Sequence, residues 1–230
     1  MAKAIRQRDL PVPPERWACR SASAVVLFVG VIAAGLMGDL LSKHFAFESL
    51  LSNPRLGEQI ALEKAMRDGT TREIIHREPV AAVLKRPIIP GVVWFTLSTN
   101  PGIVFGSQVV PRWAVNVATI LTVLVISLGF FPRSDRGDRW MHVALACIVG
   151  GALGNLYDRA LSVVTFPGGL APICNEVRDF IDFSEIGYRW VFNIADALLV
   201  VGVAIIFLKM LFPGKKKDAA SPSDAAKTSS

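Results

Sequence analysis

Four long apolar stretches divide the chain, and polar or mixed segments separate them. Each is close to the length of about 20 residues that a helix needs to cross the hydrocarbon layer of a membrane. We therefore predict four transmembrane helices, at residues 21–41, 113–131, 140–158 and 190–212. They form one domain, 21–212, which follows a basic leader (1–20) and precedes a Lys-, Ala- and Ser-rich tail (213–230), both expected to lack regular structure.

The first apolar stretch follows a basic segment, as the core of a secretory signal peptide does. It reaches Asp39 without an A-x-A cleavage site, and three further apolar stretches follow, so we interpret it as a membrane span. Gly30, Ala34 and Gly38 recur along it every four residues. This spacing of small residues lets another helix approach closely.

The two long polar segments, 42–112 and 159–189, hold the remaining structure. Residues 56–77 are rich in charge and predict a helix at the surface. Residues 88–108 contain β-branched and aromatic side chains followed by Asn-Pro-Gly, which predicts strands and turns. The predicted fold class is a membrane all-α protein: four transmembrane helices with a small extracytoplasmic β subdomain, or cradle, and an outer-surface helix.

Basic residues predict the orientation of the chain. Lys and Arg gather in the leader, in the short loop 132–139 and in the tail, which all lie on one side of a four-span topology. Because basic residues near span ends favour the cytoplasmic side, both termini are expected in the cytoplasm. The segments 42–112 and 159–189 are then extracytoplasmic.

Composition agrees with a membrane protein and excludes other classes. The chain is 52% hydrophobic, which is high for a soluble domain. Its net charge of +6 comes largely from the ends and loops and forms no basic face with aromatic residues, which argues against nucleic-acid binding. The cysteines form no CxxC pair and the histidines no HExxH motif, so neither a zinc site nor another cofactor is predicted.

Polar residues within the spans collect at one end of the predicted bundle. Ionisable groups are costly in a membrane and mark candidate functional sites. With the spans oriented as above, the outer ends carry Asp39, Lys43, Asn155, Asp158, Arg159, Asn193 and Asp196. Spacings of three and four place the neighbours on one helix face. The simplest role for Asp39–Lys43 and for Asp158–Arg159 is a structural pair that holds the bundle together.

Two carboxylates from different segments could share one water molecule. Asp196 lies near the outer end of the last span, and Asp179 or Asp182 in the preceding polar segment could meet it. Like charges close together cannot easily both ionise, so one carboxylate keeps a proton. The ionised partner then takes a proton from water while the protonated one donates to a carbonyl oxygen, which hydrolyses a peptide bond without a metal. The alternatives are a small four-span transporter for ions or protons and a structural membrane scaffold.

Five motifs in order resemble those of bacterial lipoprotein signal peptidases (signal peptidase II), which are intramembrane aspartic proteases. They cover most of residues 21–212. The motifs are Asp39-Leu-Leu-Ser-Lys43, Asn100-Pro-Gly-Ile-Val-Phe-Gly106, Gly150-Gly-Ala-Leu-Gly-Asn-Leu-Tyr-Asp-Arg159, Val177-Arg-Asp-Phe-Ile181 and Phe192-Asn-Ile-Ala-Asp196.

The resemblance implies that Asp179 and Asp196 are the catalytic dyad, because Val-Arg-Asp-Phe-Ile selects Asp179 over Asp182. It implies cleavage of the signal peptide just before a diacylglyceryl-modified cysteine, at the outer leaflet of the bacterial inner membrane. Lipid-modified prolipoproteins, membrane lipids and globomycin-type inhibitors would be the partners, and a dyad within one chain requires no dimer. Supporting residues would be Asn155, Arg159, Asn193, Asn100, Gly102, Asp39, Lys43, Asp158, Gly151 and Ala195.

The chain departs from the family in the lengths of its loops. The segments 49–88 and 160–178 look longer than usual, and the tail looks like an addition. These differences leave the shape of the extracytoplasmic part open and do not touch the dyad.

Overall fold

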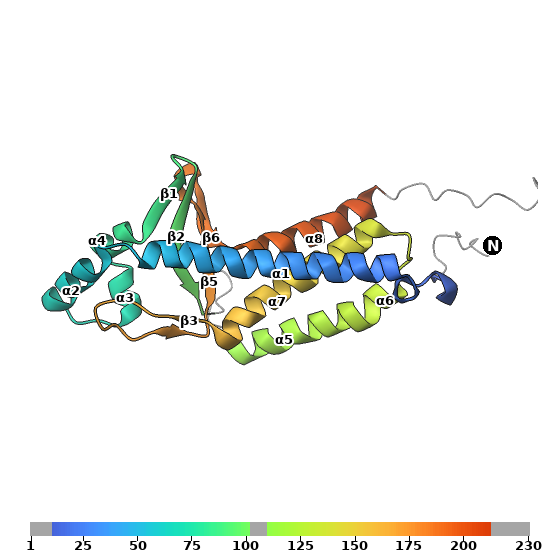
Figure 1. The fold of residues 1–230 in the computed structure, drawn as a ribbon, viewed down its shortest axis with the longest axis horizontal. Helices are drawn as coiled ribbons and strands as arrows, with labels where there is room; N and C mark the ends of the chain where they lie inside the picture. The colour runs from blue at the N-terminus through green and yellow to red at the C-terminus, as the bar shows by residue number, and fades with distance from the viewer. Residues whose placement is uncertain (1–10, 102–109, 213–230) are drawn as a thin grey trace, which may run out of the picture.

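The structure is a computed structural model that describes residues 11–101 and 110–212 (Figure 1). The predicted leader up to residue 10, the predicted tail from residue 213, and Gly102 lie outside the described residues. The main helices are α1 (Ala22–Leu51), α2 (Leu56–Met66), α3 (Thr71–Ile75), α4 (Glu78–Val83), α5 (Arg112–Leu124), the π-helical turn η4 (Val125–Phe130), α6 (Phe131–Arg133), α7 (Arg139–Leu161) and α8 (Ile194–Leu211).

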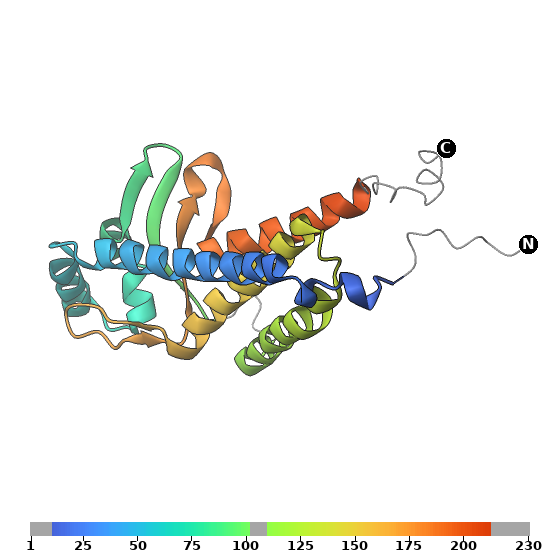
Figure 2. The same ribbon diagram turned by 45° about the vertical axis from the view of Figure 1, so that its right-hand side comes forward.

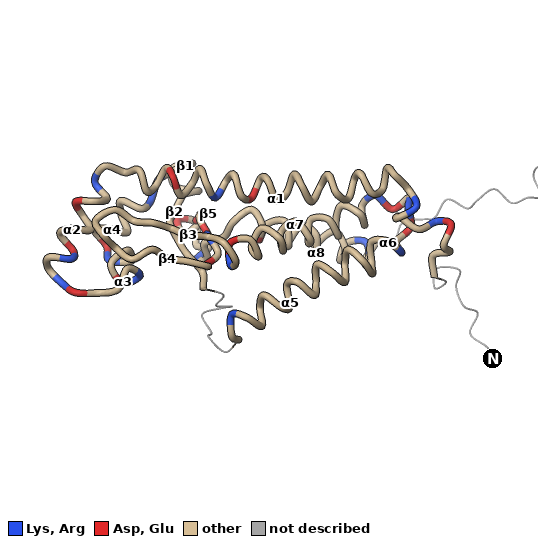
Figure 3. The backbone as a smooth tube through the Cα atoms, turned by 60° about the horizontal axis from the view of Figure 1, so that its bottom comes forward, with Lys and Arg blue, Asp and Glu red and all other residues tan. Residues whose placement is uncertain are grey.

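Four helical stretches are long and apolar enough to cross a membrane, as predicted. They are α1, the continuous run α5–η4–α6, α7 and α8. Helix α7 is by far the most buried of the four, because it packs against both α1 and α8. Figure 3 shows α5 at an angle to the other three, and charged residues mainly toward the two ends of the bundle.

Two helices have other bounds in the structure than those predicted. The first helix continues beyond residue 41 to Leu51, because Asp39 and Lys43 are buried against partners in the fold instead of ending the helix. The fourth begins at Ile194 and not at residue 190, because Tyr188–Phe192 is strand β6. Aromatic residues that alternate along this strand therefore precede the span.

Small residues on α7 allow the close packing of the bundle. A Cβ added at Gly151 would lie 2.4 Å from the Ala195 carbonyl oxygen of α8, and one at Gly150 would lie 3.4 Å from a backbone oxygen of α1. The prediction for Gly30 and Gly38 was wrong in this respect. Both are exposed with no atom within 4 Å of an added Cβ, so among the described residues no helix uses that stripe.

A four-stranded antiparallel sheet lies at one end of the bundle. This confirms the prediction that the chain contains a small β segment beside the helices. Its strand order is β1-β2-β5-β6, so two hairpins meet where β2 pairs with β5. Both hairpins stand out from the side of the bundle (Figures 1 and 2). The strands are β1 (Lys85–Ile89), β2 (Val93–Asn100), β5 (Val177–Phe183) and β6 (Tyr188–Phe192), with the short turn η5 (Ser184–Ile186) inside the second hairpin.

The single surface helix expected at residues 56–77 is instead two short helices, α2 and α3, and a third short helix, α4, follows them. The break falls at Gly69 and Thr70, where the Thr70 side chain and Glu73 form a capping box that starts α3. These helices share an apolar core with the end of α1, with the sheet, and with the short strands β3 (Val163–Val164) and β4 (Ile173–Cys174).

Part of the leader is ordered, contrary to prediction. Residues 14–20 form two short 3₁₀ helices, η2 (Pro14–Arg16) and η3 (Ala18–Arg20). The fully buried Ala18 donates its backbone N–H to the Ser134 carbonyl oxygen at 2.9 Å, in the loop before α7. The segment therefore covers the end of the bundle that lies opposite the sheet.

Candidate active site

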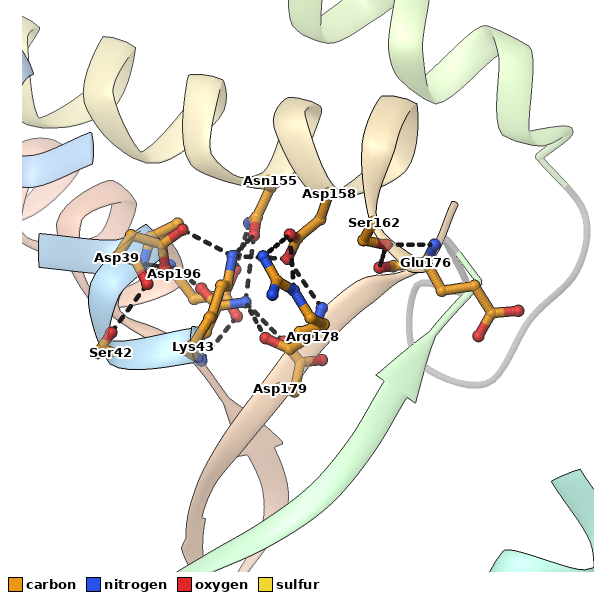
Figure 4. Close-up of polar contacts among 12 residues, drawn as sticks. Asp39, Ser42, Lys43, Asn155, Asp158, Ser162, Glu176, Arg178, Asp179 and Asp196 are labelled. Carbon is orange, nitrogen blue, oxygen red and sulfur yellow. Dashed lines mark hydrogen bonds and ion pairs between the residues drawn. The ribbon is translucent and has the colours of Figure 1, made fainter. Parts of the chain in front are cut away.

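Asn193 joins the two predicted catalytic aspartates. It is the N-cap of α8: its side-chain oxygen accepts the Asp196 backbone N–H at 2.9 Å, and the Asp196 carboxylate accepts the Asn193 backbone N–H at 3.4 Å. Its Nδ2 donates to Asp179 Oδ1 at 2.6 Å. Asp179 comes from β5 and Asp196 from the first turn of α8 (Figure 4). The Asn193 amide therefore brings carboxylates from two elements together.

Asn155 on α7 holds the other side of Asp196. Its Nδ2 donates to Asp196 Oδ1 at 2.8 Å. Its Oδ1 accepts from Asn193 Nδ2 at 3.1 Å and from Lys43 Nζ at 3.3 Å. These partners fix the orientation of both amides, since the donors must face carboxylate oxygens. Asp196 thus receives hydrogen bonds from two asparagines and lies where the helix dipole favours negative charge.

A fully buried ion-pair network lies beneath the two aspartates. Lys43 Nζ is 2.7 Å from Asp39 Oδ2 and 2.9 Å from Asp158 Oδ2, and all three side chains are inaccessible to solvent. Asp39 Oδ1 also accepts the Ala195 backbone N–H at 2.8 Å, which ties α1 to the start of α8. The predicted pair Asp39–Lys43 is confirmed. A Cβ added at Gly154 would lie 2.5 Å from Asp39 Oδ2, so α7 needs a glycine here.

The predicted pair Asp158–Arg159 was wrong. The Asp158 carboxylate instead accepts hydrogen bonds from the Arg178 guanidinium at 2.7 and 3.0 Å and from the Arg178 backbone N–H at 3.0 Å. It also forms an ion pair with Lys43. The reason is geometric: consecutive helix residues point in different directions. Sequence reasoning gave Arg178 no role. Its position next to Asp179 within a matched motif was the available signal.

Arg159 also lies near the site, but it does not pair with Asp158 as predicted. Its Nε is buried and has no hydrogen-bond partner within residues 11–101 and 110–212. Among the other predicted site residues, Asn100 ends β2, where it lies opposite Val177 of β5. Gly151 and Ala195 form the tight α7–α8 contact described above.

The environment of Asp179 favours its protonated form. The residue is 4% exposed, and burial, together with the nearby charge of Asp196, raises the pKa of Asp179 to about 8 despite the hydrogen bond from Asn193. Asp182 differs. Burial would raise its pKa, but hydrogen bonds from Ser184 and Thr96 and the charge of Lys85 outweigh burial and hold the pKa below its usual value. A protonated carboxyl, here Asp179, next to a second carboxyl, here Asp196, is the arrangement required for acid–base hydrolysis.

A groove of about 520 Å³ adjoins Asp196. It runs between the second hairpin and α8, and its walls are almost entirely apolar. An apolar or lipidated chain could lie in it with a reacting bond beside the aspartate. The lining residues are Phe183, Ile186, Tyr188, Phe192, Asp196, Ala197, Val200 and Val201.

Comparison with known proteins agrees with this geometry. The sequence profile of the family described as signal peptidase (SPase) II matches residues 31–212. The chain belongs to the signal peptidase II family. It is 36% identical over 134 residues to the lipoprotein signal peptidase of Bacillus subtilis (strain 168), covering 57% of this chain and 78% of the relative. The corresponding protein of Bacillus velezensis (strain FZB42) is 34% identical over 134 residues, covering 57% and 79%.

Solved structures give the same fold. Two structures of a bacterial membrane enzyme are each 22% identical with a TM-score of 0.53. The match covers 86% of this chain and 94% of the first, and 89% and 99% for the second. Membership of the signal peptidase II family makes the chain an aspartic-type protease with membrane-spanning helices. The comparisons give no support to the transporter alternative.

Proposed function

We propose that the chain is a lipoprotein signal peptidase that removes the signal peptide from diacylglyceryl-modified prolipoproteins by cutting before the lipidated cysteine. The observation that carries this proposal is the Asp179–Asn193–Asp196 arrangement: one carboxyl with a raised pKa lies beside another that receives hydrogen bonds from two asparagines. Family membership supplies the substrate class.

The geometry supports distinct roles for the dyad. Asp196, as the carboxylate, takes a proton from a water molecule that attacks the scissile carbonyl carbon. Asp179, protonated, donates a hydrogen bond and then its proton to the carbonyl oxygen as the tetrahedral intermediate forms. Asn193 and Asn155 keep the two carboxyls at a fixed separation before substrate arrives, and such positioning lowers the barrier.

The supporting residues divide by location. Asp39, Lys43 and Asp158 form the buried ion-pair network that holds α1, α7 and α8 together. Arg159 presents a buried Nε without a partner in the described part of the chain, and we assign it to a carbonyl of the substrate. Family resemblance assigns Asn100 and Gly102 to contacts with the peptide part of the substrate.

The placement in the membrane follows from charge. Basic residues in the leader, in the loop 132–139 and in the tail favour a cytoplasmic location for both termini. The sheet and the dyad then lie at the extracytoplasmic leaflet of the bacterial inner membrane, where a lipid-anchored precursor is available. The dyad comes from one chain, which suits a monomer, and globomycin-type peptides are expected to compete for the groove.

A matched pair of substrates tests the proposal. Purified protein in lipid vesicles is incubated with a precursor peptide whose cysteine carries diacylglycerol, and with the same peptide carrying a free cysteine. Mass spectrometry should show a product beginning at the lipidated cysteine and little cleavage of the unmodified peptide. Equal cleavage of both, or cleavage at another bond, would contradict the assigned specificity.

A further inference from the structure

The two polar segments predicted to be longer than usual for the family, 49–88 and 160–178, contact each other and form one structural unit. Lys64 Nζ of α2 donates to the Gly168 carbonyl oxygen at 3.0 Å, and Thr71 Oγ1 of α3 donates to the Ala171 carbonyl oxygen at 2.8 Å. A Cβ added at Gly168 would lie 2.8 Å from the Ile60 side chain. We call residues 56–83 together with 163–174 the cap; it lies at the end of the bundle opposite α6 (Figure 1).

The cap packs on the sheet that carries Asp179. Phe180, the next residue along β5, is 2% exposed and belongs to the same apolar core as Ile60 and Ile74 of the cap. Successive strand residues point to opposite faces. The cap therefore covers one face of β5 while Asp179 faces Asn193 on the other.

One cap residue also reaches the strand ends. Arg72 of α3 forms an ion pair with Glu176, which immediately precedes β5, and its Nη1 donates to the Thr99 carbonyl oxygen of β2 at 3.3 Å. Thr99 lies opposite Arg178 in the β2–β5 register. A single guanidinium thus fastens both strands within a few residues of Asp179 and Asn100.

Glu176 is itself fixed to the bundle. Its backbone oxygen accepts from Ser162 Oγ at 2.7 Å, and its backbone N–H donates to the same hydroxyl at 3.2 Å (Figure 4). Ser162 directly follows α7, the helix that carries Asn155. Among the described residues, a second cation near Glu176 is Arg112, which is more distant, at 3.8 Å. Arg72 is therefore the principal partner of this carboxylate.

We propose that Arg72 is a positioning residue for peptide hydrolysis: through Glu176 and the Thr99 carbonyl it holds the ends of β2 and β5, and hence the Asp179 carboxyl, in place. It does not touch the substrate. The proposal rests on the proposed function for its kinetic readout, but its effect on the strands is independent of activity.

The cap supplies a matched control. Arg77 forms an ion pair with Glu63 at 3.3 Å and donates to the Arg67 and Asp68 carbonyl oxygens. All these partners lie within the cap. Arg77→Ala therefore removes a comparable Arg–Glu pair and weakens the cap without releasing the strand ends.

The experiment compares Arg72→Ala, Arg72→Lys and Arg77→Ala in vesicles with the diacylglyceryl precursor, and measures kcat, KM, Tm and amide hydrogen exchange. Arg72→Ala should lower kcat about tenfold with KM nearly unchanged, because the dyad is misplaced while the groove is intact. Arg72→Lys should restore part of kcat, since an ammonium can keep the ion pair but cannot reproduce the forked contact. Arg77→Ala should lower Tm and leave kcat within about twofold, well short of the loss expected from misplacement.

Hydrogen exchange separates this proposal from the proposed function. Arg72→Ala should speed exchange in peptides that contain Thr99 and Asp179, and Arg77→Ala should not. If wild-type protein fails to cleave the precursor, the proposed function fails, while exchange still decides the role of Arg72. Equal losses of kcat in the two alanine variants, or unchanged exchange in Arg72→Ala, would overturn the positioning role.

Discussion

Replacing Asp179 with asparagine should make the protein more stable while removing its activity. Asparagine has the shape of a protonated aspartate and keeps an oxygen that can accept the 2.6 Å hydrogen bond from Asn193. It removes a carboxyl that the folded protein keeps protonated at neutral pH, where the same carboxyl in the unfolded chain would ionise. The residue is buried, so the change acts on the folded state directly.

The magnitude follows from the pKa. Asp179 has a pKa of about 8 in the folded protein against 3.8 for an ordinary aspartate. As pH rises from about 4 to about 8, the unfolded chain releases this proton and the folded protein retains it, so stability falls across that window. At about 1.4 kcal/mol per pH unit, the loss is about 4 kcal/mol at pH 7. We expect Asp179→Asn to recover about 2–4 kcal/mol, the lower figure if the amide loses part of a hydrogen bond.

Asp182→Asn is the matched control on the same strand. Its carboxylate accepts hydrogen bonds from Thr96 and from the Ser184 backbone N–H, each at 2.8 Å. Neutralising it should cost about 1–3 kcal/mol, because an amide leaves one of these donors without an acceptor. The two substitutions therefore change stability in opposite directions.

Thermal unfolding in detergent micelles at pH 5 and pH 8 measures both effects. A chain of this size shifts in Tm by roughly 2–4 °C per kcal/mol, so Asp179→Asn should gain about 5–15 °C, with the larger gain at pH 8. Asp182→Asn should lose several degrees at both pH values. A loss of Tm in Asp179→Asn, or a gain that does not grow with pH, would refute the view that Asp179 is held protonated.

Three further predictions follow from the site and the bundle. Lys43→Met leaves two carboxylates buried without their cation and should cost about 3–5 kcal/mol of stability, seen as a loss of folded protein in thermal unfolding. Gly154→Ala should cost about 1–3 kcal/mol, because its Cβ would strike Asp39, whereas Gly38→Ala, which has open space, should leave Tm nearly unchanged. The kcat/KM for cleavage should fall by half near pH 8, as Asp179 loses its proton; activity that stays flat to about pH 10, the usual range of a free tyrosine or lysine, would contradict its role as the acid.

Hydrophobic patterning predicted the four helices because a membrane span must be apolar along its whole length. It placed the end of the first helix too early because hydropathy counts Asp39 and Lys43 as polar, although their mutual pairing lets the helix continue to Leu51. It began the fourth helix too early because Tyr188–Phe192 is aromatic and apolar in composition but extended in the fold.

Local spacing predicted contacts within one helix and missed those between elements. Asp39–Lys43 lies at i,i+4 and is confirmed, but the partner of Asp158 is Arg178, twenty residues away on a strand. The same limit applies to Arg72 and Glu176, which only the packing of the cap brings together. Long-range ion pairs leave no periodic signal in the sequence.

The central claim is that Asp179 and Asp196 together hydrolyse the peptide bond, and single-turnover cleavage of a diacylglyceryl-modified precursor tests it most directly. Asp179→Asn and Asp196→Asn should each abolish cleavage while remaining folded, and Asp182→Asn should retain it. Wild-type rates in both dyad variants, or an inactive Asp182→Asn beside an active Asp179→Asn, would contradict the assignment.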